Sequence, residues 1–233
     1  MKLLLTGCTG FIGRELIPLL IKEGHSLTIL SRQSKDKLKP ISNNSKTRVI
    51  RMNPAESSSW NQEEIQKSLQ SCEGVINLAG EPIAEKRWTA EHRKIISDSR
   101  LKTTKNLIEN LCNLKKSPKV LINASAIGFY GSHPQTEFTE ESIPGDDFLA
   151  NLCKEWESIA KNKPRATRLV IVRIGIVLAK DGGALGKMLP IFRAGLGGPI
   201  GDGKQWMSWI HRTDLCNLIN ESVKNSSWSG LVN

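Results

Sequence analysis

Short runs of apolar residues alternate along this chain with longer amphipathic stretches. Six runs have the length of a buried strand and lie at 3–6, 26–30, 48–52, 75–78, 120–124 and 169–174. Four stretches with apolar residues at helical spacing lie at 11–23, 62–71, 90–113 and 148–161. Apolar strands that alternate with helices are typical of βαβ units and of a parallel sheet buried on both faces. The pattern predicts a doubly wound α/β fold that binds ligands beyond the carboxyl ends of its strands.

The C-terminal part of the chain has a different texture. Eight glycines, two prolines and two tryptophans crowd the stretch 182–209. We expect a domain at 1–178 and a small, loop-rich substrate lobe at 179–233 that folds over it. The polar segment 34–47 is expected to form a surface loop. Residues 230–233 resemble a strand that has just begun, so we expect the lobe to be truncated at its C-terminus.

The first predicted strand runs into a glycine-rich turn and then a helix. The turn reads Gly7-Cys8-Thr9-Gly10-Phe11-Ile12-Gly13. Gly7 permits a tight turn, Gly10 lets the backbone approach a pyrophosphate, and Gly13 allows helix and strand to pack closely. The helix N-terminus would face the phosphates with free N–H groups. Strand, turn and helix in this order predict a Rossmann-type cofactor site, whose candidate residues here are Gly7, Thr9, Gly10, Phe11, Ile12 and Gly13.

The end of the second predicted strand indicates which dinucleotide is bound. A protein selective for NAD places Asp or Glu there, to accept from the ribose 2′-hydroxyl. This chain has Ser31 and Arg32 instead. Because a guanidinium can bind a 2′-phosphate through two hydrogen bonds, the sequence favours NADP(H).

Composition narrows the class of protein. The net charge of +10 could signal nucleic acid, but Lys and Arg are spread along the chain without interleaved aromatics, so we expect no nucleic-acid partner. Five scattered cysteines form no Cys-x-x-Cys motif and suggest neither disulfides nor a metal site. No apolar stretch is long enough for a membrane span, and we expect a cytoplasmic protein without a targeting segment.

Further motifs carry a family resemblance. Asn77-Leu78-Ala79-Gly80 follows the fourth strand, and Ala124-Ser125-Ala126-Ile127-Gly128-Phe129-Tyr130-Gly131 follows the fifth. With the Gly-x-x-Gly-x-x-Gly turn, they resemble the extended short-chain dehydrogenases/reductases. Four further segments resemble the atypical epimerase branch of this superfamily, whose members are labelled nucleoside-diphosphate-sugar epimerase-like or sometimes cell-division inhibitor. These segments are Arg87-Trp88-Thr89, Ser99-Arg100, 197–201 and 205–211. The resemblance covers the whole chain and implies an NADP(H)-dependent oxidoreductase or epimerase acting on a small carbonyl or sugar-like substrate.

The resemblance also implies roles for single residues. Ser125 is expected near the nicotinamide, and the backbone at Gly175 and Ile176 beside its carboxamide. His211 and Asp214 match a strand-to-helix turn, for which a structural role is expected. Seven further residues are expected to contact the cofactor, in addition to the glycine turn and to Ser31 and Arg32. They are Leu78, Ala79, Gly80, Glu81, Arg100, Ala124 and Ile176.

Cations and indoles gather in two segments on the expected substrate side. The candidates are Lys86, Arg87, Trp88, Gln205 and Trp206, with Arg100 beside them. Cations beside a dinucleotide would suit an anionic or phosphorylated substrate, and indoles can stack on a ring or sugar face. Ordinary packing of Trp88, Trp206 and Trp209 against the glycine-rich lobe is an equally good explanation.

The sequence departs from the family at the catalytic pair. Active members use Tyr with Lys four residues later, where the ammonium lowers the pKa of the phenol and a Ser or Thr polarises the carbonyl. The single tyrosine here is Tyr130, and Pro134 stands four residues after it. Lys154 lies in the expected helix, but Ala150 stands four residues before it. The usual pair is therefore missing.

Three outcomes stay open for the chemistry. Tyr130 or Ser125 could donate the proton, with Lys154 binding the nicotinamide ribose; a cleft where the three converge would support this. His133 or His211 could serve instead. Or the chain is a catalytically silent, NADP(H)-sensing module that acts through protein contacts. By the same resemblance, the helices at 90–113 and 148–161 occupy the places of a four-helix homodimer interface.

Overall fold

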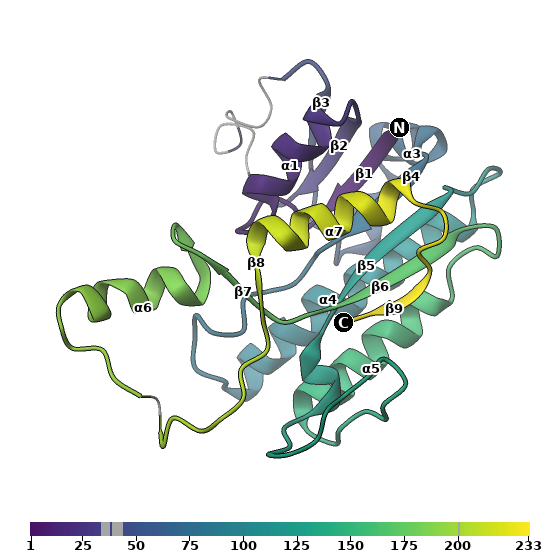
Figure 1. Cartoon of the computed structure of the whole chain (residues 1–233). Coiled ribbons are helices and arrows are strands. Elements are labelled where there is room, and N and C mark those ends of the chain that lie inside the picture. The colour runs from purple at the N-terminus through teal and green to yellow at the C-terminus, as the bar shows by residue number, and fades with distance from the viewer. Residues whose placement is uncertain (34–37, 39–43, 200) are drawn as a thin grey trace.

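A seven-stranded parallel sheet forms the centre of the molecule (Figure 1). The computed structural model describes residues 1–33, 38, 44–199 and 201–233. The strand order is β3-β2-β1-β4-β5-β6-β9, and every pairing is parallel. This confirms the predicted Rossmann-type α/β fold. The strands are β1 (Lys2–Thr6), β2 (Ser26–Ser31), β3 (Thr47–Arg51), β4 (Gly74–Asn77), β5 (Val120–Ala126), β6 (Arg168–Ile174) and β9 (Gly230–Val232).

Alternate residues of each strand bury opposite faces of the sheet. Leu3 and Leu5 of β1 pack against α1 (Gly13–Lys22) and α7 (Arg212–Lys224), whereas Leu4 packs toward the other side. That other side is covered by α3 (Glu63–Ser71) and α4 (Ala90–Cys112), and α5 (Phe148–Lys161) packs beside α4. Two helical layers thus enclose the sheet, as continuous apolar strands require. Short 3-10 helices lie at Ser57–Asn61 and Ile127–Tyr130.

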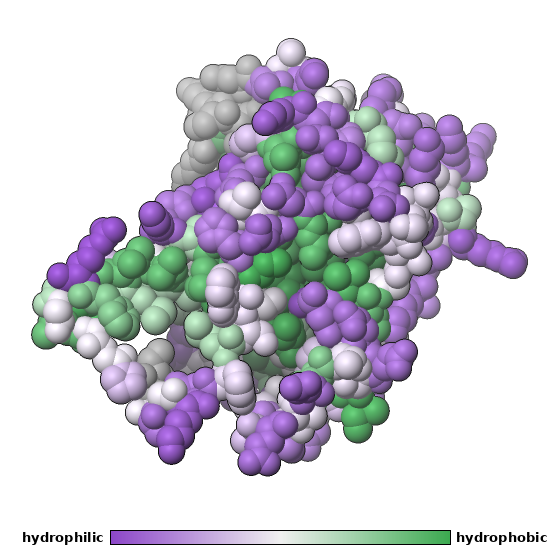
Figure 2. All heavy atoms as spheres, in the orientation of Figure 1, coloured by the Kyte–Doolittle hydropathy of each residue, from purple (hydrophilic) through white to green (hydrophobic). Residues whose placement is uncertain are grey.

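The C-terminal segment is more regular than its glycine content suggests. Where a loop-rich lobe was expected, helix α6 (Gly183–Arg193) stands between two short paired strands, β7 (Ile176–Ala179) and β8 (Trp209–His211). Helix α6 projects from the body and buries none of its residues (Figure 1). Figure 2 shows hydrophobic colour along it; Ile191 and Phe192 of α6 are exposed, as is Leu196 just after it.

Helix α7 packs on the main sheet beside α1, and strand β9 is part of that sheet. Leu215 and Ile219 of α7 join the core that α1 buries, and β9 pairs with β6. The strand-to-helix turn expected at His211 and Asp214 is present, since α7 begins at Arg212. The division at residue 178 stays a prediction. Of the predicted surface loop at 34–47, residues 34–37 and 39–43 lie outside the described residues.

No helix in the described part of the chain is long and apolar enough to cross a membrane.

Candidate cofactor site

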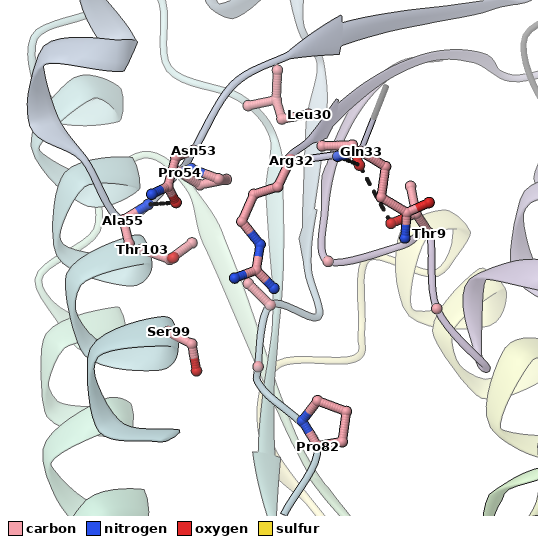
Figure 3. Close-up of a pocket in the computed structure, with 15 residues that line it drawn as sticks. Thr9, Leu30, Arg32, Gln33, Asn53, Pro54, Ala55, Pro82, Ser99 and Thr103 are labelled. Atoms are coloured by element: carbon pink, nitrogen blue, oxygen red, sulfur yellow. Dashed lines mark hydrogen bonds between the residues drawn. The ribbon is translucent and has the colours of Figure 1, made fainter. Parts of the chain in front are cut away.

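A cavity of about 250 Å³ opens at the carboxyl ends of β1 to β4 (Figure 3). Each strand ends there and passes into a loop that faces the same space, as expected for ligand sites of open parallel sheets. The cavity is lined by Gly7, Thr9, Gly10, Leu30, Ser31, Arg32, Gln33, Asn53, Pro54, Ala55, Ala79, Gly80, Pro82, Ser99 and Thr103.

The glycine turn is built as its spacing predicts. Gly7 has a φ of 73°, and a Cβ on it would lie 2.3 Å from the backbone of Leu78 and Ala79. A Cβ on Gly13 would lie 1.6 Å from the carbonyl oxygen of Cys8, so a side chain would push helix and strand apart. Over Gly10 nothing lies within 4 Å of an added Cβ. The turn is closed at its two ends and open in the middle, beside the cavity.

Helix α1 points its N-terminus toward this turn. At its N-cap position, Ile12, no side chain accepts a hydrogen bond from the first N–H groups of the helix. Such a helix end suits an anion from outside the chain. Thr9 and Ser31 place their hydroxyl oxygens 3.4 Å apart, and the backbone N–H of Gln33 donates to Ser31 Oγ at 3.1 Å. These contacts join the turn to the end of β2.

Arg32 extends from the end of β2 across the cavity (Figure 3). Its side chain is 62% exposed, and one guanidinium nitrogen lies 3.6 Å from a carboxylate oxygen of Glu81. A surface pair of this length contributes little to stability. The Glu81 carboxylate therefore holds the guanidinium only weakly, and an anion that accepts closer hydrogen bonds could replace it.

The loop after β4 is held by the first half of α4. Arg100 donates to the Glu81 carbonyl at 3.0 Å, and the Glu81 N–H donates to Ser99 Oγ at 2.9 Å. A Cβ on Gly80 would lie 2.8 Å from the Arg100 guanidinium carbon, so this glycine makes room for it. Burial lowers the pKa of Arg100 from its usual value. Arg100 thus supports the cavity wall from behind and does not itself line the cavity.

Buried amides fix the strand ends beneath this loop. Asn77 donates to Asn123 at 2.7 Å and to Thr104 at 2.9 Å, and it accepts from the N–H of Ala79 at 3.3 Å. Thr104 also accepts from Trp156 Nε1 at 2.7 Å. Leu78 is partly buried against the core, and Ala124 is buried in β5.

Ser125 and Tyr130 belong to one buried polar network around an ion pair. Ser125 Oγ donates to Glu157 at 2.7 Å, and Arg173 donates to both carboxylate oxygens of Glu157 at 2.8 and 2.9 Å. Arg173 also donates to Tyr130 Oη at 2.7 Å, and Tyr130 donates to Asn233 Oδ1 at 2.6 Å. Burial alone would lower the pKa of Arg173, but its hydrogen bonds with Glu157 and Tyr130 raise it overall. Both hydroxyl protons are thereby directed at protein acceptors.

Of the three groups expected to converge in a cleft, Ser125 and Tyr130 are buried and are joined through the Glu157–Arg173 pair. Lys154 lies on α5 with an exposed side chain, and the contacts that join Ser125 to Tyr130 do not include it. His133 is exposed and lies 2.6 Å from Thr136 Oγ1, while His211 caps α7 by accepting from the Thr213 N–H. Ile176 is exposed at the start of β7, after Gly175.

The expected substrate residues lie on two exposed segments. Lys86, Arg87 and Trp88 precede α4, where Trp88 donates to the Ile83 carbonyl at 2.7 Å and packs edge-on against Phe148. Gln205 and Trp206 follow α6, and Trp206 is 88% exposed. Lys187 of α6 donates to the Ala84 carbonyl at 3.4 Å, which links α6 to the loop that carries the first set.

Sequence reasoning missed several residues of the site. Asn53, Pro54 and Ala55 follow β3 and could have been found, because loops after parallel strands meet at one edge. Ser99 and Thr103 lie four residues apart on α4, a spacing that places them on one helix face. Glu157 and Arg173 come from α5 and β6 and follow no local motif. The described residues contain no group of three or more His, Cys, Asp or Glu side chains that could hold a metal.

Comparisons of sequence agree with the motifs. The family model of the NAD dependent epimerase/dehydratase family matches residues 3–227. The epimerase family protein SDR39U1 homolog, chloroplastic, of Arabidopsis thaliana is 41% identical over 235 residues. Homo sapiens epimerase family protein SDR39U1 is 36% identical over 236 residues. Both alignments cover the whole chain, which spans 65% of the length of the Arabidopsis relative and 74% of the human one.

Solved structures agree with the fold. The crystal structure of human SDR39U1 (isoform 2) with NADPH matches at a TM-score of 0.84 and 35% identity, over all of this chain and 73% of that one. UDP-glucuronic acid 4-epimerase from Bacillus cereus, in complex with UDP-glucuronic acid and NAD, matches at a TM-score of 0.81 over all of this chain and 76% of that one. At 20% identity, the second match shows a shared fold alone. The first supports the resemblance to the atypical epimerase branch, and the chain belongs to the NAD dependent epimerase/dehydratase family.

Proposed function

We propose that this chain binds NADP(H) in the cavity and acts as an oxidoreductase or epimerase on a small carbonyl or sugar-like substrate. The observation that carries the proposal is the cavity itself, with open space over Gly10 at one end and Arg32 reaching across it. The human relative of known structure was solved with NADPH, which supports the same choice of nucleotide here.

The residues present fit this cofactor. The open backbone at Gly10 and the uncapped start of α1 suit a pyrophosphate. The guanidinium of Arg32 suits a 2′-phosphate, with Ser31 and Thr9 as hydroxyl neighbours and Glu81 as the anion that the phosphate replaces. Phe11, Ile12 and Gly13 would shape the turn; Leu78, Ala79, Gly80 and Arg100 would form or support the wall; and Ala124 and Ile176 would lie toward the nicotinamide. When bound, the cofactor supplies hydride transfer at its nicotinamide C4.

Ser125 and Tyr130 are the proposed groups for proton movement. Because Ser125 donates to Glu157, its oxygen lone pairs are the part available to a substrate hydroxyl. Tyr130 would have to leave Asn233 before its proton could move to a substrate. Lys154 is assigned the nicotinamide ribose. Lys86, Arg87, Trp88, Gln205 and Trp206 would receive the substrate, whose class we infer to be anionic.

The decisive measurement is a titration with NADPH and NADH, followed by quenching of tryptophan fluorescence. The wild-type protein should prefer NADPH, and Arg32→Ala should weaken NADPH at least about tenfold, equivalent to about 1.4 kcal/mol, with little change for NADH. Arg165→Ala is the matched control, because it removes an exposed arginine from the opposite edge of the sheet. Binding of neither nucleotide by the wild-type protein would overturn the proposal.

A catalytically silent, NADP(H)-sensing module is the second candidate. The commitment of both hydroxyl protons to Glu157 and Asn233 favours it. Consumption of NADPH in the presence of a panel of aldehydes, ketones and sugar nucleotides separates the two candidates. Turnover that is lost in Ser125→Ala supports the enzyme, whereas tight NADPH binding without turnover of any compound supports the module.

The remaining parts of the proposal concern location and assembly. We place the protein in the cytoplasm, which fractionation of cells tests, and we assign α4 and α5 to a homodimer interface. Helix α4 is 23 residues long and packs against α5, and its residue Ile95 is exposed.

A further inference from the structure

A cluster of charged groups joins the glycine turn to two segments from the end of the chain. We call it the Arg212 cluster; its charged members are Glu15, Asp181 and Arg212, and Phe11 and Thr213 complete it. Arg212 donates to Glu15 at 2.7 Å and lies 2.9 Å from a carboxylate oxygen of Asp181. Thr213 Oγ1 donates to the second carboxylate oxygen of Glu15. The cluster thus connects α1, the turn after β7 and the first turn of α7.

The same cluster contacts the backbone and the ring of the glycine turn. Arg212 donates to the Phe11 carbonyl at 3.4 Å, and its guanidinium lies 4.7 Å from the centre of the Phe11 ring. A Cβ on Gly182 or Gly183 would lie 2.9 or 2.8 Å from atoms of the same ring. The two glycines therefore allow the start of α6 to pack directly on Phe11.

Glu15 creates an electrostatic problem that Arg212 solves. Its carboxylate stands in the first turn of α1, at the helix end proposed to receive the cofactor phosphates. Hydrogen bonds from Thr213 and Arg212, together with the charge of Arg212, keep the pKa of Glu15 below its usual value in spite of its burial. An ionised carboxylate without a counter-charge would repel a phosphate at the same helix terminus. Arg212 supplies that counter-charge. Its side chain is only 12% exposed, so solvent and salt screen its charge less than they screen the charge of a surface residue.

We propose that Arg212 is a positioning residue for the cofactor that acts through Glu15: it neutralises this carboxylate beside the phosphate site. The inference rests on the proposed binding of NADP(H). It assigns to the C-terminal part of the chain a share in cofactor affinity, although none of the five cluster residues lines the cavity.

The test compares NADPH affinity among four variants by tryptophan quenching. Arg212→Gln should weaken NADPH roughly three- to tenfold, because Glu15 then faces the phosphates unpaired. Glu15→Gln should bind at least as tightly as the wild type, and the double variant Glu15→Gln/Arg212→Gln should return to within about twofold of it. Arg212→Lys keeps the charge but not the guanidinium contacts, and should weaken NADPH less than Arg212→Gln does.

A purely structural role predicts the opposite ranking, since the double variant loses more contacts than either single one. A double variant as weak as Arg212→Gln, or an Arg212→Gln variant with wild-type affinity, would overturn the inference while leaving NADP(H) binding by the wild type intact. Thermal unfolding without nucleotide checks that each variant is folded. If Arg212→Gln is not folded, the NADPH affinities of Arg212→Lys and Glu15→Gln carry the test. If the wild type binds no nucleotide, the proposed function fails and the inference with it.

Discussion

The Glu157–Arg173 pair is the clearest case in which single residues determine the local structure. Both side chains are 2% exposed, and the pair shares two hydrogen bonds. Arg173 stands opposite Ser125 in the register of β5 and β6, so both side chains leave the sheet on the same face, toward Glu157. Removing two charges from water costs free energy that only such complete pairing offsets. The pair therefore depends on both partners being present.

Loss of one partner should be far more harmful than loss of both. We expect Arg173→Met to lower the free energy of unfolding by about 3–5 kcal/mol, because Glu157 stays buried without a counter-charge. The double variant Arg173→Met/Glu157→Leu should recover part of that loss, and Arg48→Met, in an exposed pair with Glu64, should cost less than about 1 kcal/mol. Urea denaturation measures all three. A double variant less stable than Arg173→Met would contradict this view of the pair.

At the scale of elements, the β1–turn–α1 unit was predictable from the sequence because everything that shapes it is local. A strand, three glycines and a helix follow one another within 22 residues, and Gly7 and Gly13 each have a separate steric reason. Helix α6 was not predictable in the same way. Its segment contains Gly183, Gly186 and Pro190, which favour loops in isolation, and α6 begins where the chain packs on Phe11, far away in sequence.

The glycine turn offers a matched pair of substitutions. Gly13→Ala should destabilise the protein by about 3 kcal/mol or more, because the new Cβ meets the Cys8 carbonyl oxygen. Gly10→Ala should change stability by less than about 1 kcal/mol, since its Cβ meets open space. NADPH affinity should nevertheless fall at least about tenfold in Gly10→Ala, because the methyl group occupies the approach of the pyrophosphate. Denaturation and nucleotide titration of both variants check this, and equal destabilisation by the two alanines would contradict it.

For the whole molecule, the parallel direction of the strands in the main sheet could be predicted from their hydrophobic pattern, but the polar network around Ser125 could not. Its members come from β5, α5, β6, a 3-10 helix and the last residue, and no spacing in the sequence brings them together. The missing Tyr/Lys pair was visible in the sequence. That Glu157 and Arg173 surround Ser125 and Tyr130, with Lys154 outside, became visible only in three dimensions.

The proposed homodimer concerns the surface of the whole molecule. We expect a dimer in sedimentation at micromolar concentration, with α4 and α5 at its interface. Ile95→Glu on α4 should dissociate it, whereas Ile143→Glu should not, because that more exposed side chain lies in the loop before α5. Wild-type protein that sediments only as a monomer would contradict the assignment.

The packing of α7 on α1 also bears on how the chain folds as it is synthesised. Contacts such as Arg212 with Glu15 join residues 197 positions apart. The part of the apolar face of α1 that α7 covers therefore stays in water until residues 212–224 have also been synthesised. Contacts of such long range are slow to form, and an uncovered helix face in the meantime is a site for aggregation or for chaperones. The helix that begins the cofactor site is thus made early and covered late.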